Sequence, residues 1–216
     1  KKVLLVGLGI LGGGVSTALW FLKRKVKLII TDLKSKEDLK QSIKKLSKYK
    51  KQIKYVLGKH RFIDFKNNDL IIVNPAVSTI NNPYLNYAKK FNKPIENDLS
   101  FLFKLTDNFK ICITGTRGKT TTTNWTYFLI KNKFKNALIG GNIPEHPIFS
   151  LVDKIKNSEP LILETSCFQL ELLADRPNIA VITSLYRDHL NRYKTMKTYA
   201  KIKAKIFLNQ TSSDYL

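Results

Sequence analysis

The chain is poor in sulfur-containing residues, with two cysteines and one methionine among 216 residues. Two thiols alone cannot complete a zinc site, so we expect Cys112 and Cys167 to be reduced thiols of a cytoplasmic protein. Long apolar runs are also absent: none approaches the ~18 residues of a membrane-spanning helix, and no signal peptide precedes the first strand pattern. The sequence therefore predicts no membrane partner.

Acidic residues are scarce as well. The chain has 16 of them against 38 basic residues, which gives a net charge of +22. A charge of this size could serve nucleic-acid binding, but the lysines are scattered and no recognition helix, zinc finger or RNP-like motif is present. We prefer a solvated basic surface that also attracts anionic substrates, and we expect no nucleic-acid partner.

The length and the hydrophobic content of 43% allow two modest domains with full cores. Lys93-Pro94 is a plausible boundary, so we predict an α/β protein with domains at 1–94 and 95–216. No methionine opens the chain, and residues 214–216 read like the start of a strand. Both ends therefore look cut, and we expect the C-terminal part of the second domain to be missing.

The most informative stretch is a glycine turn in the middle of the chain. The β-branched run 111–114 leads through Gly115 and Gly118 to Lys119 and Thr120, and a helical pattern follows. A strand, a glycine turn, a lysine and a hydroxyl at a helix start form a phosphate-binding P-loop. Only two residues separate the glycines, where four are usual, so an ordinary strand-to-helix turn is the alternative.

A second glycine turn lies near the start. Strand 3–6 is followed by the GxGxxG of Gly7, Gly9 and Gly12 and then by a predicted helix, and strand 26–31 ends on Asp32. This pattern is typical of a Rossmann dinucleotide fingerprint, in which Asp32 would meet a ribose hydroxyl. A glycine-rich turn that packs a helix on a sheet is the alternative.

Other predicted elements place polar residues at strand ends. Residues 35–50 read as a surface helix, strand 70–73 ends in a loop at 74–77, and Asn82-Pro83 opens a helix. In the second domain, Gly140-Gly141-Asn142 ends one strand, and strand 161–163 ends on Glu164, a natural Mg²⁺ ligand or a helix cap. Strand 179–183 precedes His189, whose strand-end position favours a site over a plain surface histidine.

One lysine of the final helix stands apart from the others. Lys203 falls on the apolar stripe of Met196, Tyr199, Ala200, Ile206 and Phe207, whereas Lys197, Lys201 and Lys205 fall on the opposite face, which we expect to be in water. Lys203 therefore either extends its ammonium out of the core or has a buried task.

Taken together, five motifs resemble those of the Mur ligase family, and the glutamate-adding branch most of all. They are GTRGKTT at 115–121, GGNI at 140–143, ETSCFQLE at 164–171, DHLNRY at 188–193 and YAKIK at 199–203. The resemblance implies a Rossmann-like UDP-binding domain, a central ATPase domain and a C-terminal amino-acid-binding domain, which this chain would lack. It also accounts for the short P-loop.

The resemblance further implies an ATP-dependent ligase of peptidoglycan precursor synthesis, and hence a role in cell shape and division. ATP would phosphorylate the carboxylate of UDP-N-acetylmuramoyl-L-alanine, and glutamate would attack the acyl phosphate to form an amide. Two Mg²⁺ ions would offset the crowded negative charge. A cytoplasmic monomer is expected, and the isolated chain would be inactive.

The residue roles that the resemblance implies fall into three groups. ATP would be bound by Gly115, Thr116, Arg117, Gly118, Lys119, Thr120 and Thr121. The catalytic and metal groups would be Lys119, Thr120, Glu164, His189 and a carbamylated Lys203. The UDP-muramyl substrate would contact Ile10, Leu11, Asp32, Lys34, Ala76, Asn142, Ser166 and Gln169.

Several positions depart from the common family pattern. Arg117 stands where Asn is usual, Cys167 replaces a second Ser, Asn191 replaces an Asp and Pro144 replaces a Gly. These departures leave open whether D- or L-glutamate is added. Another Mur-type or folylpolyglutamate-type ligase and a nucleotide-binding module without ligase chemistry stay as alternatives. For 1–94 alone an NAD dehydrogenase is the alternative.

Overall fold

The computed structural model describes residues 2–156 and 159–216, which form two compact α/β units. The division falls between Asp98 and Leu99, four residues after the boundary that the sequence suggested. Within the described residues, no helix combines the length and the apolar character that crossing a bilayer requires. Both cysteines are buried free thiols.

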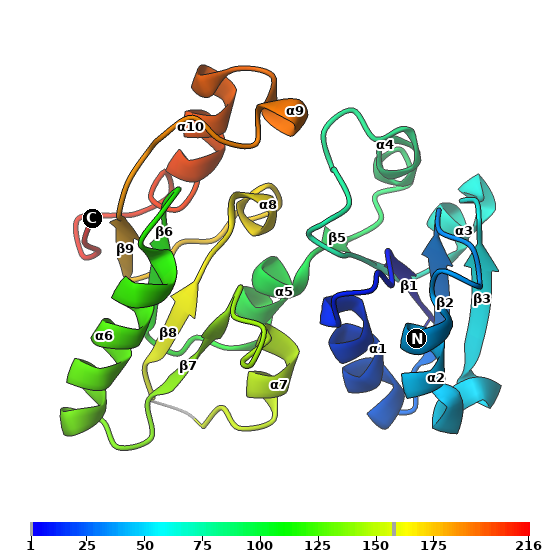
Figure 1. Ribbon diagram of the computed structural model, residues 1–216, viewed down its shortest axis with the longest axis horizontal. Helices are drawn as coiled ribbons and strands as arrows, with labels where there is room; N and C mark the ends of the chain where they lie inside the picture. Colours follow the sequence, from blue (N-terminus) through cyan, green and yellow to red (C-terminus); the bar gives the residue numbers. More distant parts are fainter. Residues whose placement is uncertain (1, 157–158) are drawn as a thin grey trace. The chain divides into compact units, whose positions relative to one another are not determined.

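The first unit is a five-stranded parallel sheet in the order β3-β2-β1-β4-β5. Leu4, Leu5 and Ile72 are almost fully buried, as expected for a sheet covered on both faces. Figure 1 shows this unit in colours from blue through cyan to green, with α4 and β5 at the green end. Its elements in chain order are β1 (Lys2–Val6), α1 (Gly13–Lys23), β2 (Lys27–Asp32), α2 (Lys40–Lys45), the 3₁₀ helix η1 (Ser47–Gln52), β3 (Ile53–Leu57), α3 (Phe62–Asn67), β4 (Leu70–Val73), α4 (Pro83–Lys89) and β5 (Ile95–Glu96).

The predicted helix over 35–50 is wrong as a single element. The structure has a turn at its start, then α2, then η1. Ser35 and Asp38 cause the turn, because the Ser35 hydroxyl donates to the Asp38 carboxylate at 2.8 Å and the Asp38 N–H donates back to that hydroxyl at 3.1 Å. Such local bonds compete with helix formation. The predicted start of α4 is confirmed, since the Asn82 side chain caps it and Pro83 follows.

The second unit is a four-stranded parallel sheet in the order β7-β8-β6-β9. The P-loop strand β6 lies inside it, between β8 and β9. Strand β8 (Leu161–Glu164) agrees with the predicted strand that ends on Glu164. The elements are α5 (Asp98–Leu105), β6 (Lys110–Thr114), α6 (Lys119–Lys133), β7 (Leu138–Gly141), α7 (Ile148–Val152), β8 (Leu161–Glu164), α8 (Cys167–Leu170), β9 (Ile179–Ile182), α9 (Leu190–Tyr193) and α10 (Met196–Ala204).

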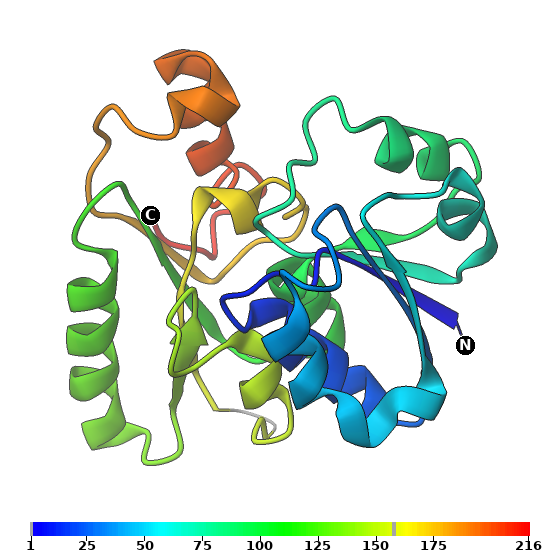
Figure 2. The same ribbon diagram turned by 45° about the vertical axis from the view of Figure 1, so that its right-hand side comes forward.

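Alternating residues of β6 serve two cores, one on each face of this sheet. Ile111 and Ile113 pack with Tyr127 and Ile130 of α6, whereas Cys112 belongs to the larger core that α5, α7, α8 and α10 help to form. This alternation follows from the two-residue period of a strand. Figures 1 and 2 both show α9 and α10 at the end of the sheet where β6 ends. The sheet therefore brings the P-loop, α9 and α10 to one end.

Candidate functional site

The P-loop joins β6 to α6 through two glycines. Gly118 has φ 82° and occupies the cap position of α6, with no side chain bonded to the helix start. The Lys119 ammonium folds back and donates to the carbonyl oxygens of Gly115 at 3.1 Å and Thr116 at 3.0 Å. This places a positive charge beside the positive end of the helix dipole. The corner is therefore suited to an anion.

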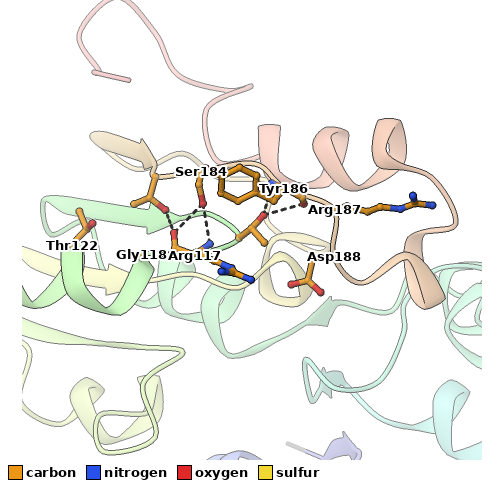
Figure 3. A pocket seen from close by; sticks show the side chains of 9 residues that line it. Arg117, Gly118, Thr122, Ser184, Tyr186, Arg187 and Asp188 are labelled. Carbon is orange, nitrogen blue, oxygen red and sulfur yellow. Dashed lines mark hydrogen bonds between the residues drawn. The ribbon is translucent and has the colours of Figure 1, made fainter.

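A loop after β9 holds the P-loop in place, as Figure 3 shows. The backbone N–H of Thr116 donates to the carbonyl oxygen of Ser184 at 3.0 Å, and that of Arg117 donates to the Ser184 hydroxyl at 2.9 Å. The Thr183 hydroxyl donates to the Arg117 carbonyl oxygen at 2.5 Å. A Cβ on Gly115 would lie 2.0 Å from this hydroxyl, so only glycine fits.

Four backbone amides at the start of α6 stay available to a ligand. Among the described residues, the N–H groups of 118–121 donate to no protein acceptor. They are the amides that a helix N-terminus leaves unpaired, and they are where an anion binds. The side chains of Arg117, Thr120 and Thr121 are exposed there. These amides and Lys119 together form a phosphate-sized anion site.

An open cavity of 930 Å³ adjoins the loop (Figure 3). Its walls come from the P-loop, from α6 and from the loop after β9. The lining residues are Thr116, Arg117, Gly118, Thr122, Thr183, Ser184, Tyr186, Arg187 and Asp188. The space is large enough for a nucleotide-sized ligand.

Glu164 joins two residues that the sequence had suggested separately. The Thr120 hydroxyl donates to one carboxylate oxygen of Glu164 at 2.6 Å, and the Asn142 amide donates to the other at 2.9 Å. Glu164 is only 2% exposed. It does not cap a helix, because Ser166 caps α8. The structure thus brings Thr120, Asn142 and Glu164 together at the P-loop.

Lys203 is buried, with 2% of its surface exposed, which decides between the two alternatives that the apolar stripe left open. Its ammonium donates to the Gly115 carbonyl oxygen at 2.9 Å and to the Thr114 hydroxyl at 3.3 Å. Burial, together with a smaller contribution from the positive charge of Lys119, lowers the pKa of Lys203 to about 8. The ammonium therefore does not extend into solvent but is buried and bonded to the P-loop. Lys205, by contrast, is half-buried and bonded to the Glu171 carbonyl oxygen, so the expectation of a solvated Lys205 is wrong.

His189 precedes the single turn of α9 in a left-handed conformation, with φ 51°. Its ring lies 4.7 Å from that of Phe168 and 6.3 Å from that of Tyr199. Its Nε2 is 3.5 Å from an Asp188 carboxylate oxygen. Tyr199 also lies 5.0 Å below the Lys203 ammonium, so one aromatic ring adjoins both predicted groups.

Ser166 and Gln169 satisfy each other in the capping box of α8. The Ser166 hydroxyl donates to the Gln169 side-chain oxygen at 3.1 Å and accepts from the Gln169 N–H at 3.2 Å. Both residues are buried. The structure thus gives them a local role that fixes the turn after Glu164.

The predicted residues of the first unit gather at the ends of β1, β2 and β4. The Asp32 carboxylate accepts from the N–H groups of Gly9 at 3.0 Å and Lys34 at 2.9 Å. Ala76 donates its N–H to the Asn74 side chain at 3.0 Å. The side chains of Ile10 and Leu11 are exposed, at 59% and 95%. Open parallel sheets bind ligands at this edge, beside the switch in strand order.

Two parallel α/β units, each with a glycine loop between a strand and a helix, have the architecture that is typical of nucleotide-binding proteins. Comparison with known families gives the same result: residues 1–96 match the Mur ligase MurD-like N-terminal domain, and residues 113–216 match the Mur ligase middle domain. The chain therefore belongs to the Mur ligase family, as its motifs had indicated.

Individual relatives support this assignment. The chain is 44% identical over 210 residues to the UDP-N-acetylmuramoylalanine--D-glutamate ligase of Borreliella burgdorferi (strain ZS7), covering 97% of this chain and 45% of the relative. It is 36% identical to the enzyme of that name from Clostridioides difficile (strain 630), covering 100% and 47%. Among solved structures, UDP-N-acetylmuramate-alanine ligase MurC from Thermotoga maritima aligns with a TM-score of 0.53 at 25% identity, covering 95% and 46%. The chain spans about half the length of the curated relatives it matches.

Proposed function

We propose that the protein is an ATP-dependent ligase that forms an amide between UDP-N-acetylmuramoyl-L-alanine and D-glutamate in peptidoglycan precursor synthesis. The observation that carries the proposal is the convergence of Lys119 and Lys203 on the Gly115 carbonyl oxygen, next to the Thr120–Glu164 pair. The relatives are named as D-glutamate ligases, which favours the D isomer. A cytoplasmic monomer without a nucleic-acid or membrane partner is part of the proposal.

ATP would supply the phosphoryl group that turns the substrate carboxylate into an acyl phosphate. The chain's own contribution is to hold the phosphates with the amides of 118–121 and with Lys119. Arg117 lines the adjoining cavity and would add a further charge. Thr116 is fixed to the loop after β9 and so keeps the P-loop in shape.

The residues present fit Mg²⁺. The Thr120 hydroxyl and the Glu164 carboxylate are oxygen ligands that already lie side by side, and Asn142 orients the second carboxylate oxygen. Mg²⁺ prefers such oxygen ligands and would neutralise phosphate charge. A second ion would be held by His189 and by Lys203 after carbamylation. The lowered pKa of Lys203 supports this modification, because only the neutral amine reacts with CO₂.

We also propose that the first unit binds the UDP moiety. Asp32 and Lys34 would contact uracil and diphosphate, with Ile10, Leu11 and Ala76 nearby, and Ser166, Gln169 and Asn142 of the second unit would take part in holding the muramyl-alanine portion. The clustering of the first five at one sheet edge supports this assignment.

The test uses the full-length gene product with ATP, Mg²⁺ and UDP-N-acetylmuramoyl-L-alanine, and supplies D-glutamate, L-glutamate or another amino acid. We expect the amide product by mass spectrometry, with equimolar phosphate release, for D-glutamate. A product with another amino acid would indicate a different Mur-type ligase. ATP binding without any amide product would indicate a nucleotide-binding module.

Carbamylation has a separate test. Protein equilibrated with ¹³C-bicarbonate should show a carbamate ¹³C signal that is lost in Lys203→Ala and kept in Lys197→Ala, the matched control on the exposed face of α10. Full activity of Lys203→Arg would contradict the carbamate role, because a guanidinium cannot form it.

A further inference from the structure

A buried carboxylate, that of Glu171, contacts α9, the short helix that follows His189. Glu171 follows α8, and its side chain is 1% exposed. One of its oxygens accepts from the Arg192 Nε at 2.7 Å and from the Tyr193 hydroxyl at 2.8 Å, and the other accepts from the Arg192 Nη2 at 2.8 Å. Three donors, two of them on one guanidinium, make this a strong, geometrically specific contact.

All three donors belong to the helix that His189 begins. α9 has only four residues, and so short a helix is not stable by itself. The N–H groups of Arg192 and Tyr193 both donate to the His189 carbonyl oxygen at 3.0 Å. Whatever fixes Arg192 and Tyr193 therefore also fixes the backbone of His189.

A second line of contacts reaches the imidazole through the Phe168 ring. The Arg192 guanidinium lies over the Phe168 ring at 4.4 Å, and the same ring lies 4.7 Å from the His189 ring. Because Glu171 holds the guanidinium, it also sets where Phe168 and His189 meet. The Glu171 carbonyl oxygen also accepts from Lys205 at 2.6 Å, two residues after Lys203.

We propose that Glu171 is a positioning residue for the site, acting through Arg192 and Tyr193 to hold the His189 imidazole at the P-loop corner. This proposal rests on the proposed function insofar as His189 is a working group of the ligase. The anchoring itself is a property of the fold and can be measured without substrate. Neither Glu171 nor Arg192 is expected to touch a ligand.

Glu171→Gln keeps the size of the side chain and removes the charge that pairs with Arg192. Arg192→Lys keeps the charge but loses the two-pronged contact. The matched control is Asp64→Asn in the first unit, where the Asp64 carboxylate, 6% exposed, accepts two bonds from Arg61 at 2.7 Å each. The control removes the same kind of ion pair far along the chain from His189.

The readout exploits the three histidines of the chain, His60, His146 and His189. In ligand-free protein, ¹H–¹³C spectra of the imidazole Cε1 groups should show the His189 signal, assigned with His189→Asn, displaced or broadened in Glu171→Gln and in Arg192→Lys. The signals of His60 and His146 should not move. Asp64→Asn should leave the His189 signal in place.

In the full-length enzyme, Glu171→Gln should lower kcat by about 10- to 100-fold, as loss of a supporting contact behind a metal ligand does, and Asp64→Asn should not. An unmoved His189 signal in folded Glu171→Gln and Arg192→Lys overturns the anchoring, even if kcat falls. If the signal moves but the wild type forms no amide, the proposed function fails and the anchoring stands.

Discussion

The two glycine loops of this protein have the same backbone arrangement and opposite electrostatic surroundings. Each follows an interior strand of a parallel sheet and ends on a glycine in a left-handed conformation, Gly12 at φ 96° and Gly118 at φ 82°. Neither α1 nor α6 has a side-chain cap. Both helix starts can therefore offer backbone N–H groups to an anion.

The charges around the loops differ. At the P-loop two lysines, Lys119 and Lys203, point at the Gly115 carbonyl oxygen. At the first loop a carboxylate, Asp32, accepts from Gly9 inside the loop. A negative charge so placed favours the hydrogen-bond donors of a ligand, so a diphosphate at this edge would depend on Lys34 and on the N-terminus of α1. The comparison teaches that the glycine pattern provides the space, and that neighbouring charge selects the ligand.

The largest effect is expected from removing the charged residue of each loop and measuring the affinity for both ligands. Lys119→Ala should weaken ADP binding roughly 100- to 1,000-fold, because it removes the charge aimed at the phosphates, and should leave UDP-muramyl binding unchanged. Asp32→Ala should instead weaken binding of the UDP-muramyl ligand and leave ADP binding unchanged. Titration calorimetry measures both, with Lys135→Ala, an exposed lysine, as the control. Equal loss of both ligands in either variant would contradict separate sites.

The close packing of the first loop predicts a smaller effect, on stability. A Cβ on Gly14 would lie 2.2 Å from the Leu8 carbonyl oxygen, whereas a Cβ on Gly13 meets nothing within 4 Å. Gly14→Ala should therefore lower the free energy of unfolding by about 1–3 kcal/mol through overpacking, and Gly13→Ala should not lower it. Urea denaturation measures the free energy of unfolding of both variants. Equal values would contradict the prediction and show that the loop backbone moves to make room for the Cβ.

The smallest effect is expected at the first residues of β1 and β6, the strands that precede the two glycine loops. Lys2 is exposed, but Lys110 is buried and donates to Thr106 and Asn108 carbonyl oxygens, and burial lowers its pKa below 10.5. Between the two pKa values the unfolded chain holds more protons, so the free energy of unfolding should rise with pH up to about 10.5. Lys110→Met should remove part of this rise, and Lys2→Met should not. Urea denaturation at several pH values measures the free energy of unfolding of each variant. If the curves of this free energy against pH run parallel for the wild type and Lys110→Met, the prediction is wrong.

Sequence patterns predicted the interior of both sheets well, for a physical reason. Strands such as β4 and β8 are buried on both faces and so consist of unbroken apolar runs. The edge strand β3 was not predicted, because its residues 53–57 mix Lys54 and Tyr55 with apolar residues. Only Val56 of this strand is buried. β5 has two residues, too few for any pattern.

The site was predictable where one segment carries its own signal. Local spacing marked the P-loop turn, Glu164 and Lys203 as candidates, each beside a structural alternative, and the resemblance to a family supplied their expected roles. The contacts of Thr183 with Arg117 and of Glu171 with Arg192 join residues 66 and 21 positions apart. No local pattern marks such pairs, since they depend on which strands and helices become neighbours.

The Gly115 carbonyl oxygen has a practical consequence for handling the protein. A carbonyl oxygen bears only a partial negative charge, yet two ammonium groups use it as their acceptor. The excess positive charge attracts any small polyanion, whatever its identity. Phosphate or sulfate in a buffer will therefore compete with the nucleotide, and an affinity measured in such a buffer will understate the true one.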